Sequence, residues 1–154
     1  IALAQKHKKL ITVDPKFHNF YCYTGVTVFK PNRKEASDML KMKIRTSADI
    51  EAAGRELLQK LRAQYILLTL GEEGIAIFNE NGEVKRMPTK ARKVADVSGA
   101  GDTVISTLTM ALSAGASIEE ACFLANYAGG LVCEEVGIIP IEKELLFEAA
   151  AEED

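Results

Sequence analysis

The chain has 154 residues with a formal net charge of −3, and 47% of its residues are hydrophobic. A chain of this length buries about 70% of the surface that its unfolded form exposes, which is enough for a hydrophobic core. The mild acidity, without a block of basic residues, argues against nucleic acid or an anionic membrane surface as the main partner. No apolar run approaches the roughly 18 residues that predict a membrane span. Three cysteines without CxxC spacing favour a reducing compartment, so we expect a cytoplasmic protein.

The first part of the chain predicts a helix followed by two strands. Residues 1–9 resemble the last turns of a helix with no capping residue ahead of it, from which we expect the domain to begin upstream. Leu10–Val13 predicts a buried strand that ends at Asp14-Pro15, and Val26–Phe29 predicts a second strand that ends before Pro31. The aromatic residues between these strands are expected to pack over the sheet edge.

Two helices are predicted next. Asn32 followed by Glu35 has the spacing of a capping box, which predicts a helix over Arg33–Leu40. Apolar residues then recur at helical spacing over Ala48–Arg62, with Ser47 or Asp49 placed to start that helix.

The rest of the chain alternates strand and helix patterns. Tyr65–Leu70 is a continuous apolar run typical of a strand covered on both faces. Ile75–Phe78 and Val84–Met87 flank an Asn-Gly turn and predict an antiparallel hairpin. Helical patterns over residues 101–114, 118–135 and 141–154 follow, the first ended by Gly115. The alternation predicts one α/β domain over residues 1–154, with a mostly parallel sheet between helices and an antiparallel edge hairpin.

The stretch from Asp96 to Thr103, with the sequence DVSGAGDT, carries the clearest chemical signal. Gly99 and Gly101 remove the side chains that would hold an anion away from the backbone, and the first N–H groups of the following helix are free to bind one. Asp102 could then accept a proton from a substrate hydroxyl while the amides stabilise a transferring phosphoryl group. The alternative is an ordinary glycine turn with an acid at a helix N-terminus.

Three further features point to a nucleotide but have structural explanations as well. Asn32 and Glu35 could reach Mg²⁺ through water, although a capping box explains the same two residues. The TLGEEG sequence at 69–74 follows a strand and suits a nucleotide in the crevice, or forms a glycine turn. The small residues around Asn126 would let a flat base approach, or would let helices pack closely.

In this order the motifs resemble those of the ribokinase-like, PfkB-type carbohydrate kinases, and they match the C-terminal half of such a kinase. The resemblance implies a three-layer α/β/α fold and ATP-dependent transfer of a phosphoryl group to a sugar or sugar-phosphate hydroxyl. It implies that Asp102 is the catalytic base and that Gly99, Ala100 and Gly101 form the anion hole. The remaining implied roles are phosphate and Mg²⁺ binding at Asn32 and Glu35, ATP binding at Thr69, Gly71 and Gly74, the adenosine side at Asn126, and a monovalent cation such as K⁺ at Asp96 and Ser98.

Within this family, the sequences VDPK at 13–16 and KPN at 30–32 look most like the heptose-7-phosphate kinases of lipopolysaccharide-precursor synthesis. Residues that would choose the sugar lie in the family's N-terminal half, which has no counterpart here, and a homodimer is expected only of the full-length protein. The alternatives are a non-catalytic ATP-binding module and a kinase for another sugar or nucleoside. A dinucleotide-binding domain is disfavoured because no GxGxxG opens the first helix, and a P-loop kinase is excluded because GxxxxGK[ST] is absent.

Overall fold

The computed structural model describes residues 1–89, 95–137 and 140–151. The chain divides into two compact units: unit 1 comprises residues 1–71 and 75–86, and unit 2 comprises residues 72–74 and 87–154. Within the described ranges, no helix combines the length and the apolar character needed to cross a membrane.

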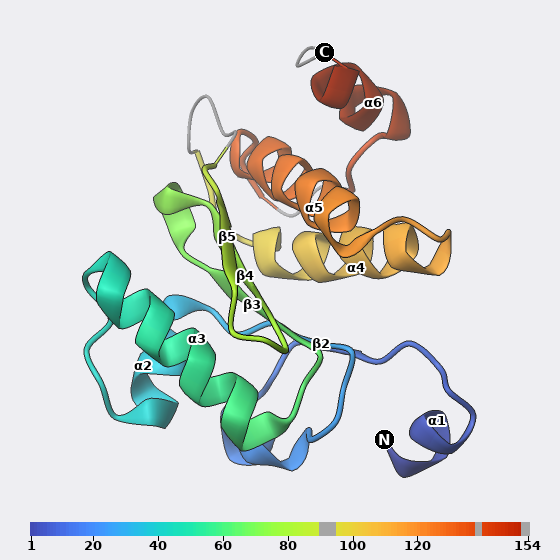
Figure 1. The fold of residues 1–154 in the computed structure, drawn as a ribbon. Helices are drawn as coiled ribbons and strands as arrows, with labels where there is room; N and C mark the ends of the chain where they lie inside the picture. The colour runs from blue at the N-terminus through green and yellow to red at the C-terminus, as the bar shows by residue number, and fades with distance from the viewer. Residues whose placement is uncertain (90–94, 138–139, 152–154) are drawn as a thin grey trace. The chain divides into compact units, whose positions relative to one another are not determined.

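Unit 1 contains a mixed sheet in the order β1-β2-β3-β4-β5. The β1–β2 and β2–β3 pairs are parallel, and β3 and β4 are antiparallel. The expected α/β class is therefore confirmed, with the hairpin strands at one edge (Figure 1). The elements of this part of the chain are α1 (Ala2–Lys6), β1 (Thr12–Val13), the 3₁₀ helix η1 (Phe17–Cys22), β2 (Val28–Phe29), α2 (Arg33–Leu40), α3 (Ser47–Leu61), β3 (Tyr65–Thr69), the 3₁₀ helix η2 (Gly71–Glu73), β4 (Ile75–Asn79) and β5 (Val84–Met87).

The first two strands are shorter than the sequence predicts. The predicted strand Leu10–Val13 is reduced to Thr12–Val13, and the predicted strand Val26–Phe29 is reduced to Val28–Phe29. Their ladder joins only Thr12 to Val28 and Val13 to Phe29. An apolar pattern shows which residues are buried but not where hydrogen bonding to the neighbouring strand begins, so it overestimates the strand length.

The start of α3 corrects another expectation, because the N-cap is Thr46 rather than Ser47 or Asp49. The Thr46 side chain accepts a hydrogen bond from the Asp49 N–H at 3.2 Å, and Asp49 Oδ2 accepts one from the Thr46 N–H at 2.8 Å. This is a complete capping box. Asp49 belongs to the third helical position of the box and not to its cap.

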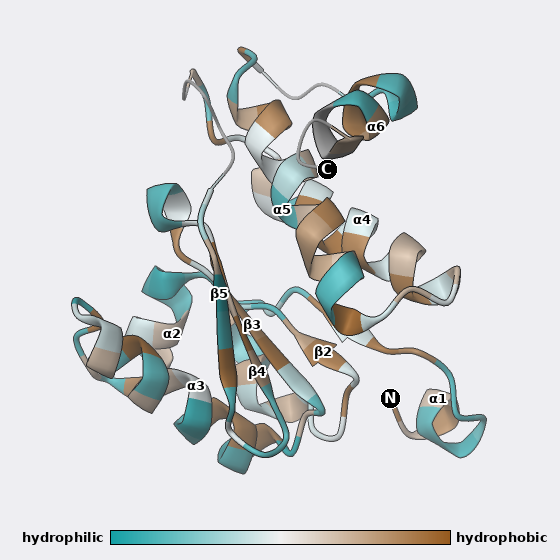
Figure 2. Cartoon of the chain, turned by 45° about the horizontal axis from the view of Figure 1, so that its top comes forward, coloured by the Kyte–Doolittle hydropathy of each residue, from teal (hydrophilic) through white to brown (hydrophobic). Residues whose placement is uncertain are grey.

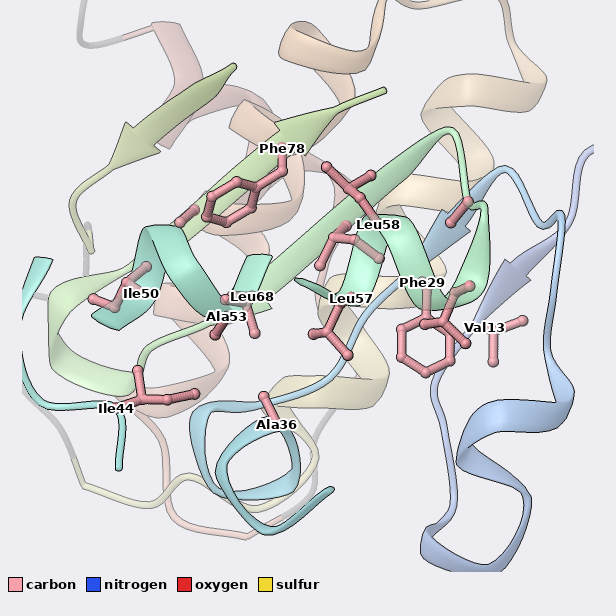
Figure 3. Close-up of a cluster of buried hydrophobic side chains, with 14 of the residues drawn as sticks. Val13, Phe29, Ala36, Ile44, Ile50, Ala53, Leu57, Leu58, Leu68 and Phe78 are labelled. Atoms are coloured by element: carbon pink, nitrogen blue, oxygen red, sulfur yellow. The ribbon is translucent and has the colours of Figure 1, made fainter. Parts of the chain in front are cut away.

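The core of unit 1 lies between the sheet and the helices α2 and α3, which occupy the same face of the sheet (Figure 1). Figure 3 shows side chains of α3, including Ile50, Leu57 and Leu58, in one cluster with Phe78 of β4. The strands differ in hydropathy, because the middle of β3 is hydrophobic and the middle of β5 is hydrophilic (Figure 2). Phe20 of η1 packs edge-on against Phe29, with ring centroids 4.9 Å apart, so the expected packing on the sheet is confirmed for Phe20. It is not general to these aromatic residues, because Phe17 and Tyr21 are exposed.

Unit 2 contains the helices α4 (Ala100–Ser113), α5 (Ile118–Cys133) and α6 (Lys143–Ala151). Gly115 adopts φ +95° between the first two, so the predicted helix stop is confirmed. A Cβ added to Gly129 of α5 would lie 2.7 Å from Val104 Cγ2 of α4. The small residues of α5 therefore allow close packing against α4. The last helix ends within the predicted range 141–154, of which residues 152–154 lie outside the described residues.

Candidate functional site

The predicted anion-binding loop joins directly to the first turn of α4. Gly99 is the N-cap residue and adopts φ +82°, a conformation that favours glycine over residues with a side chain. Ala100, Gly101 and Asp102 then form the first helical turn, and Asp102 is exposed. The local geometry agrees with the prediction that glycine lets the chain enter the helix without covering its N-terminus.

The N-terminus of α4 differs from those of α2, α3 and α5. Each of those three helices has a capping box, whereas α4 has no side-chain cap. The Thr103 N–H donates to the Gly99 carbonyl at 2.9 Å, and the Ala100 N–H donates to the Val97 carbonyl at 3.3 Å. Within the part of the chain that the structure describes, the hydrogen bonds include none from the N–H groups of Gly101 and Asp102. Two backbone donors at the positive end of the helix dipole are thus available to an anion.

Asp96 holds the loop that precedes α4. Its Oδ1 accepts a hydrogen bond from the Ser98 N–H at 2.9 Å, and its Oδ2 accepts one from the Gly137 N–H at 3.3 Å. Hydrogen bonds from the backbone and side chain of Ser98, and then from the backbone of Gly137, lower the pKa of the Asp96 carboxyl from its ordinary value of 3.8. The carboxylate is therefore charged near neutral pH and joins this loop to the segment that follows α5.

Asn32 and Glu35 bind each other at the start of α2. Asn32 Oδ1 accepts a hydrogen bond from the Glu35 N–H at 2.8 Å, and Glu35 Oε2 accepts one from the Asn32 N–H at 2.7 Å. The predicted capping box is confirmed, and it engages one oxygen of each side chain. The Asn32 side chain is on an exposed residue and Glu35 is partly exposed, so both remain accessible from solvent.

Thr69 lies beside Asn32 at the carboxyl ends of the strands. Asn32 and Thr69 form an isolated parallel bridge, and the Thr69 N–H donates to the Pro31 carbonyl at 3.1 Å. The structure thus brings together two predicted sites, the Asn32–Glu35 pair and the end of β3, within unit 1. Ligands of open α/β sheets bind outside these carboxyl ends.

Gly74 and Asn126 approach the same short segment, Pro88–Thr89, within unit 2. A Cβ on Gly74, which has φ +84°, would lie 2.5 Å from Pro88 C and Thr89 N. The Asn126 side-chain amide donates to the Pro88 carbonyl at 2.7 Å, and Asn126 is only 7% exposed. Both residues therefore have a structural task there. Gly71 has φ +65°, and a Cβ added there would meet no atom within 4 Å, so the backbone conformation of the turn is the reason for a glycine at this position.

One polar feature of unit 1, directly before Pro31 and Asn32, has no counterpart in the sequence analysis. Lys30 is buried and its Nζ lies 3.1 Å from Asp14 Oδ2. The signal that could have found it is that each residue directly follows a predicted strand and directly precedes a proline. Spacing alone does not pair them, because the pairing depends on the register of β1 with β2.

The side chains of Asn32 and Glu35 have the chemistry to bind a Mg²⁺ ion that keeps most of its water ligands. Across residues 1–89, 95–137 and 140–151, no group of three or more His, Cys, Asp or Glu side chains is placed to hold a metal. Mg²⁺ in phosphoryl-transfer sites is commonly held by one or two carboxylates, several waters and the phosphates of the substrate. The Glu35 carboxylate and the Asn32 amide are a donor set of that kind.

Comparison with known proteins is consistent with this arrangement of motifs. The family model described as pfkB family carbohydrate kinase matches residues 1–144. The chain belongs to this family. The bifunctional protein HldE of Desulfatibacillum aliphaticivorans is 44% identical over 135 residues, which cover 88% of this chain and 28% of that protein. The bifunctional protein HldE of Syntrophotalea carbinolica is 38% identical over 151 residues, which cover 98% of this chain and 31% of that protein. The chain thus spans about three tenths of the length of these relatives.

Solved structures show that this member of the pfkB family has the ribokinase-like fold. Phosphofructokinase-2 from Escherichia coli, in complex with substrates and products, superposes with a TM-score of 0.86 at 21% identity, over 98% of this chain and 50% of that one. Arabidopsis thaliana ribokinase, complexed with ribose and ATP, gives a TM-score of 0.74 at 26% identity, over 81% of this chain and 41% of that one. The expected fold is confirmed as part of a ribokinase-like domain.

Proposed function

We propose that residues 1–154 form the C-terminal nucleotide-binding and catalytic part of one carbohydrate kinase domain. In the full-length protein this part would transfer the γ-phosphoryl group of ATP to the hydroxyl of a sugar or sugar phosphate. Membership of the pfkB family supports the reaction class. The observation that carries the proposal is the N-terminus of α4, where glycine replaces a capping side chain and Asp102 stands in the first turn.

The proposed chemistry follows from these groups. Asp102 accepts the proton of the acceptor hydroxyl, whose oxygen attacks the γ-phosphorus of ATP, and ADP leaves. The N–H groups of Gly101 and Asp102 stabilise the negative charge on the transferring phosphoryl group, because fixed backbone dipoles need no reorganisation during the reaction. This set differs from the expected Gly99, Ala100 and Gly101, because the Ala100 N–H already donates to the Val97 carbonyl. Positioning and charge stabilisation supply most of the rate in such transfers.

The nucleotide and ions are assigned on the same basis. Mg²⁺, when bound, would neutralise charge on the phosphates, and Asn32 and Glu35 would hold it through water. Thr69, Gly71 and Gly74 would contact ATP, with Asn126 on the adenosine side. Asp96 and Ser98 would bind a monovalent cation. An ionised Asp96 supports that last assignment, as does an Escherichia coli phosphofructokinase-2 structure in complex with potassium.

We propose a heptose phosphate as the acceptor. The support is the VDPK and KPN sequences described above, together with 36–44% identity to bifunctional HldE proteins. The fold itself does not identify the sugar, because phosphofructokinase and ribokinase structures both superpose on this chain, with TM-scores of 0.86 for the former and 0.74 and 0.78 for the latter.

The catalytic base is tested by Asp102→Asn in the full-length protein. We expect turnover with MgATP and heptose 7-phosphate to fall by about 10²- to 10⁴-fold, the usual contribution of a general base. The dissociation constant of MgATP should change little, because the amide preserves size and the backbone donors remain. Steady-state kinetics and calorimetric titration measure the two quantities.

The matched control is Asp38→Asn, the same change at an exposed residue of α2. Its turnover should equal that of the unsubstituted protein. Normal turnover in Asp102→Asn would show that the base is assigned to the wrong residue. Binding of MgATP by the unsubstituted protein, without transfer to any sugar, would favour a non-catalytic nucleotide-binding module.

A further inference from the structure

Lys30 and Asp14 form an ion pair in unit 1 in which the lysine is buried and the carboxylate is partly buried. The exposed fractions of the two side chains are 3% for Lys30 and 25% for Asp14. Removing an ammonium and a carboxylate from water costs several kcal/mol for each ion, and an apolar pair of similar volume is often equally stable. Stability alone therefore gives a weak reason for a charged pair among the apolar residues of this region.

The pair lies directly after two strands that are in register. Val13 pairs with Phe29 in the parallel ladder, and Asp14 and Lys30 are the next residues of the two strands. The Lys30 N–H also donates to the Val13 carbonyl at 2.8 Å. Lys30 is thus fixed to the β1 side by its main chain and by its side chain.

The next residues connect this anchor to the predicted phosphate and Mg²⁺ site. Pro31 follows Lys30 and has a restricted φ, and its carbonyl accepts the hydrogen bond from the Thr69 N–H at 3.1 Å. Asn32 then bridges to Thr69 and caps α2 together with Glu35. Only Pro31, with its restricted φ, separates Lys30 from Asn32, so a displacement of Lys30 would be transmitted to Asn32.

We propose that Lys30 is a positioning residue for nucleotide binding. Its ion pair with Asp14 holds the segment Pro31–Glu35 against β3 and so fixes the amide and the carboxylate that face the nucleotide phosphates and Mg²⁺. Lys30 acts through Asn32 and Glu35 and has no task of its own in the transfer. The expected effect on ATP binding rests on the proposed function, but the positioning of Pro31–Glu35 can be measured by hydrogen exchange without any activity.

The test uses the full-length protein with Lys30→Met, Asp14→Asn and the double variant. We expect the affinity for ATP in the presence of Mg²⁺ to fall by about 10- to 100-fold, the usual effect of losing a group that orients ligands of a metal. The affinity for ATP in EDTA should fall much less. The double variant should be no worse than Lys30→Met, because the two residues act as one pair. Hydrogen exchange should become faster at the amides of Glu35 and Thr69.

The matched control is Lys60→Met, the same change in the exposed ion pair between Lys60 and Glu56 of α3. It should leave Mg²⁺-dependent ATP affinity and these exchange rates unchanged. Asp14→Asn keeps the carbon chain of Lys30 in place and provides the test if Lys30→Met does not fold.

Two results would overturn the proposal. One is a lower melting temperature in Lys30→Met and Asp14→Asn with unchanged Mg²⁺-dependent ATP affinity, which would make the pair purely structural. The other is unchanged amide exchange at Glu35 and Thr69. If the unsubstituted protein binds no MgATP, the proposed function fails, and the exchange rates still decide whether Lys30 positions this segment.

Discussion

Asn32 and Glu35 cap α2 and are also the pair that we propose for phosphate and Mg²⁺ binding. The capping box uses the Asn32 Oδ1 and the Glu35 Oε2 atoms to satisfy two backbone N–H groups. The Asn32 side-chain nitrogen and the second carboxylate oxygen of Glu35 remain for contacts outside the helix. Their conformation is set by the cap before any ligand binds, which lowers the entropic cost of binding.

Asp96 leads to a prediction about stability and pH. Its pKa is lowered in the folded protein, so the stabilisation from its carboxylate is present above the unfolded-state pKa of about 3.9 and is lost as the pH falls through the lower folded-state pKa. Asp96→Asn should therefore unfold more easily than the unsubstituted protein at pH 7. The difference between their free energies of unfolding should stay constant above about pH 5 and shrink below about pH 4.

Urea unfolding of both proteins across this pH range measures the difference, with Asp38→Asn as the control for an exposed acid of α2. A difference that stays the same down to pH 3 would show that the Asp96 charge does not hold the loop. The hydrogen bonds that Asp96 accepts from the Ser98 and Gly137 N–H groups would then stabilise the fold equally whether or not the carboxyl is ionised.

Among the longer helices α3, α4 and α5, the start of α4 differs from the other two. Thr46 and Ser117 cap α3 and α5 with side chains that accept backbone hydrogen bonds. Gly99 at the start of α4 offers no such group. A side-chain cap would occupy the donors that a phosphoryl group needs, so the missing cap is consistent with the proposed anion hole.

The packing of α3 on β4 leads to a prediction for Gly54. A Cβ at this position would lie 2.5 Å from Cε1 and Cε2 of Phe78. Gly54→Ala should therefore destabilise the protein, because a clash that costs about 1–3 kcal/mol outweighs the roughly 1 kcal/mol gained in helix propensity. Chemical denaturation measures the change.

The background Phe78→Leu provides the matched comparison for this prediction. Once the ring is removed, Gly54→Ala should be neutral or stabilising, and a double-mutant cycle gives the coupling between the two positions. Stabilisation by Gly54→Ala in the presence of Phe78 would mean that the ring moves aside at little cost.

For the molecule as a whole, the question to test is whether residues 1–154 alone bind MgATP and whether they alone transfer phosphate. If residues 1–154 unfold in one cooperative transition, we expect them to bind MgATP without transferring phosphate to a sugar. MgATP at about 100 times its dissociation constant should raise the free energy of unfolding by roughly 2.7 kcal/mol. Thermal unfolding with increasing MgATP measures this, and Mg²⁺ alone is the control.

A cooperatively folded chain that shows no response to MgATP, beside a full-length protein that does respond, would contradict this prediction. The nucleotide site would then need residues outside positions 1–154. Transfer to heptose 7-phosphate by this chain alone would contradict it in the other direction, because the residues that choose the sugar would then lie within it.

The sequence by itself determined the class of the fold, most helices and the identity of the family. A helix start was predictable where the N-cap residue and the residue at the third helical position bond each other, as Asn32 and Glu35 do. Both residues lie within one turn, so their spacing in the sequence is enough to identify the pair. The DVSGAGDT stretch likewise indicated an uncapped helix start, since glycine needs no distant partner to adopt φ +82°.

Only the tertiary structure decided features that depend on strand register and on packing between elements. The short ladders of β1 and β2, the ion pair of Lys30 with Asp14, and the contact of Gly54 with Phe78 each join residues distant in sequence. Their partners are chosen by which atoms meet when the sheet and helices assemble. The hydrogen bond from Asn126 to the Pro88 carbonyl is of the same kind, because 38 residues separate the two and no local pattern pairs them.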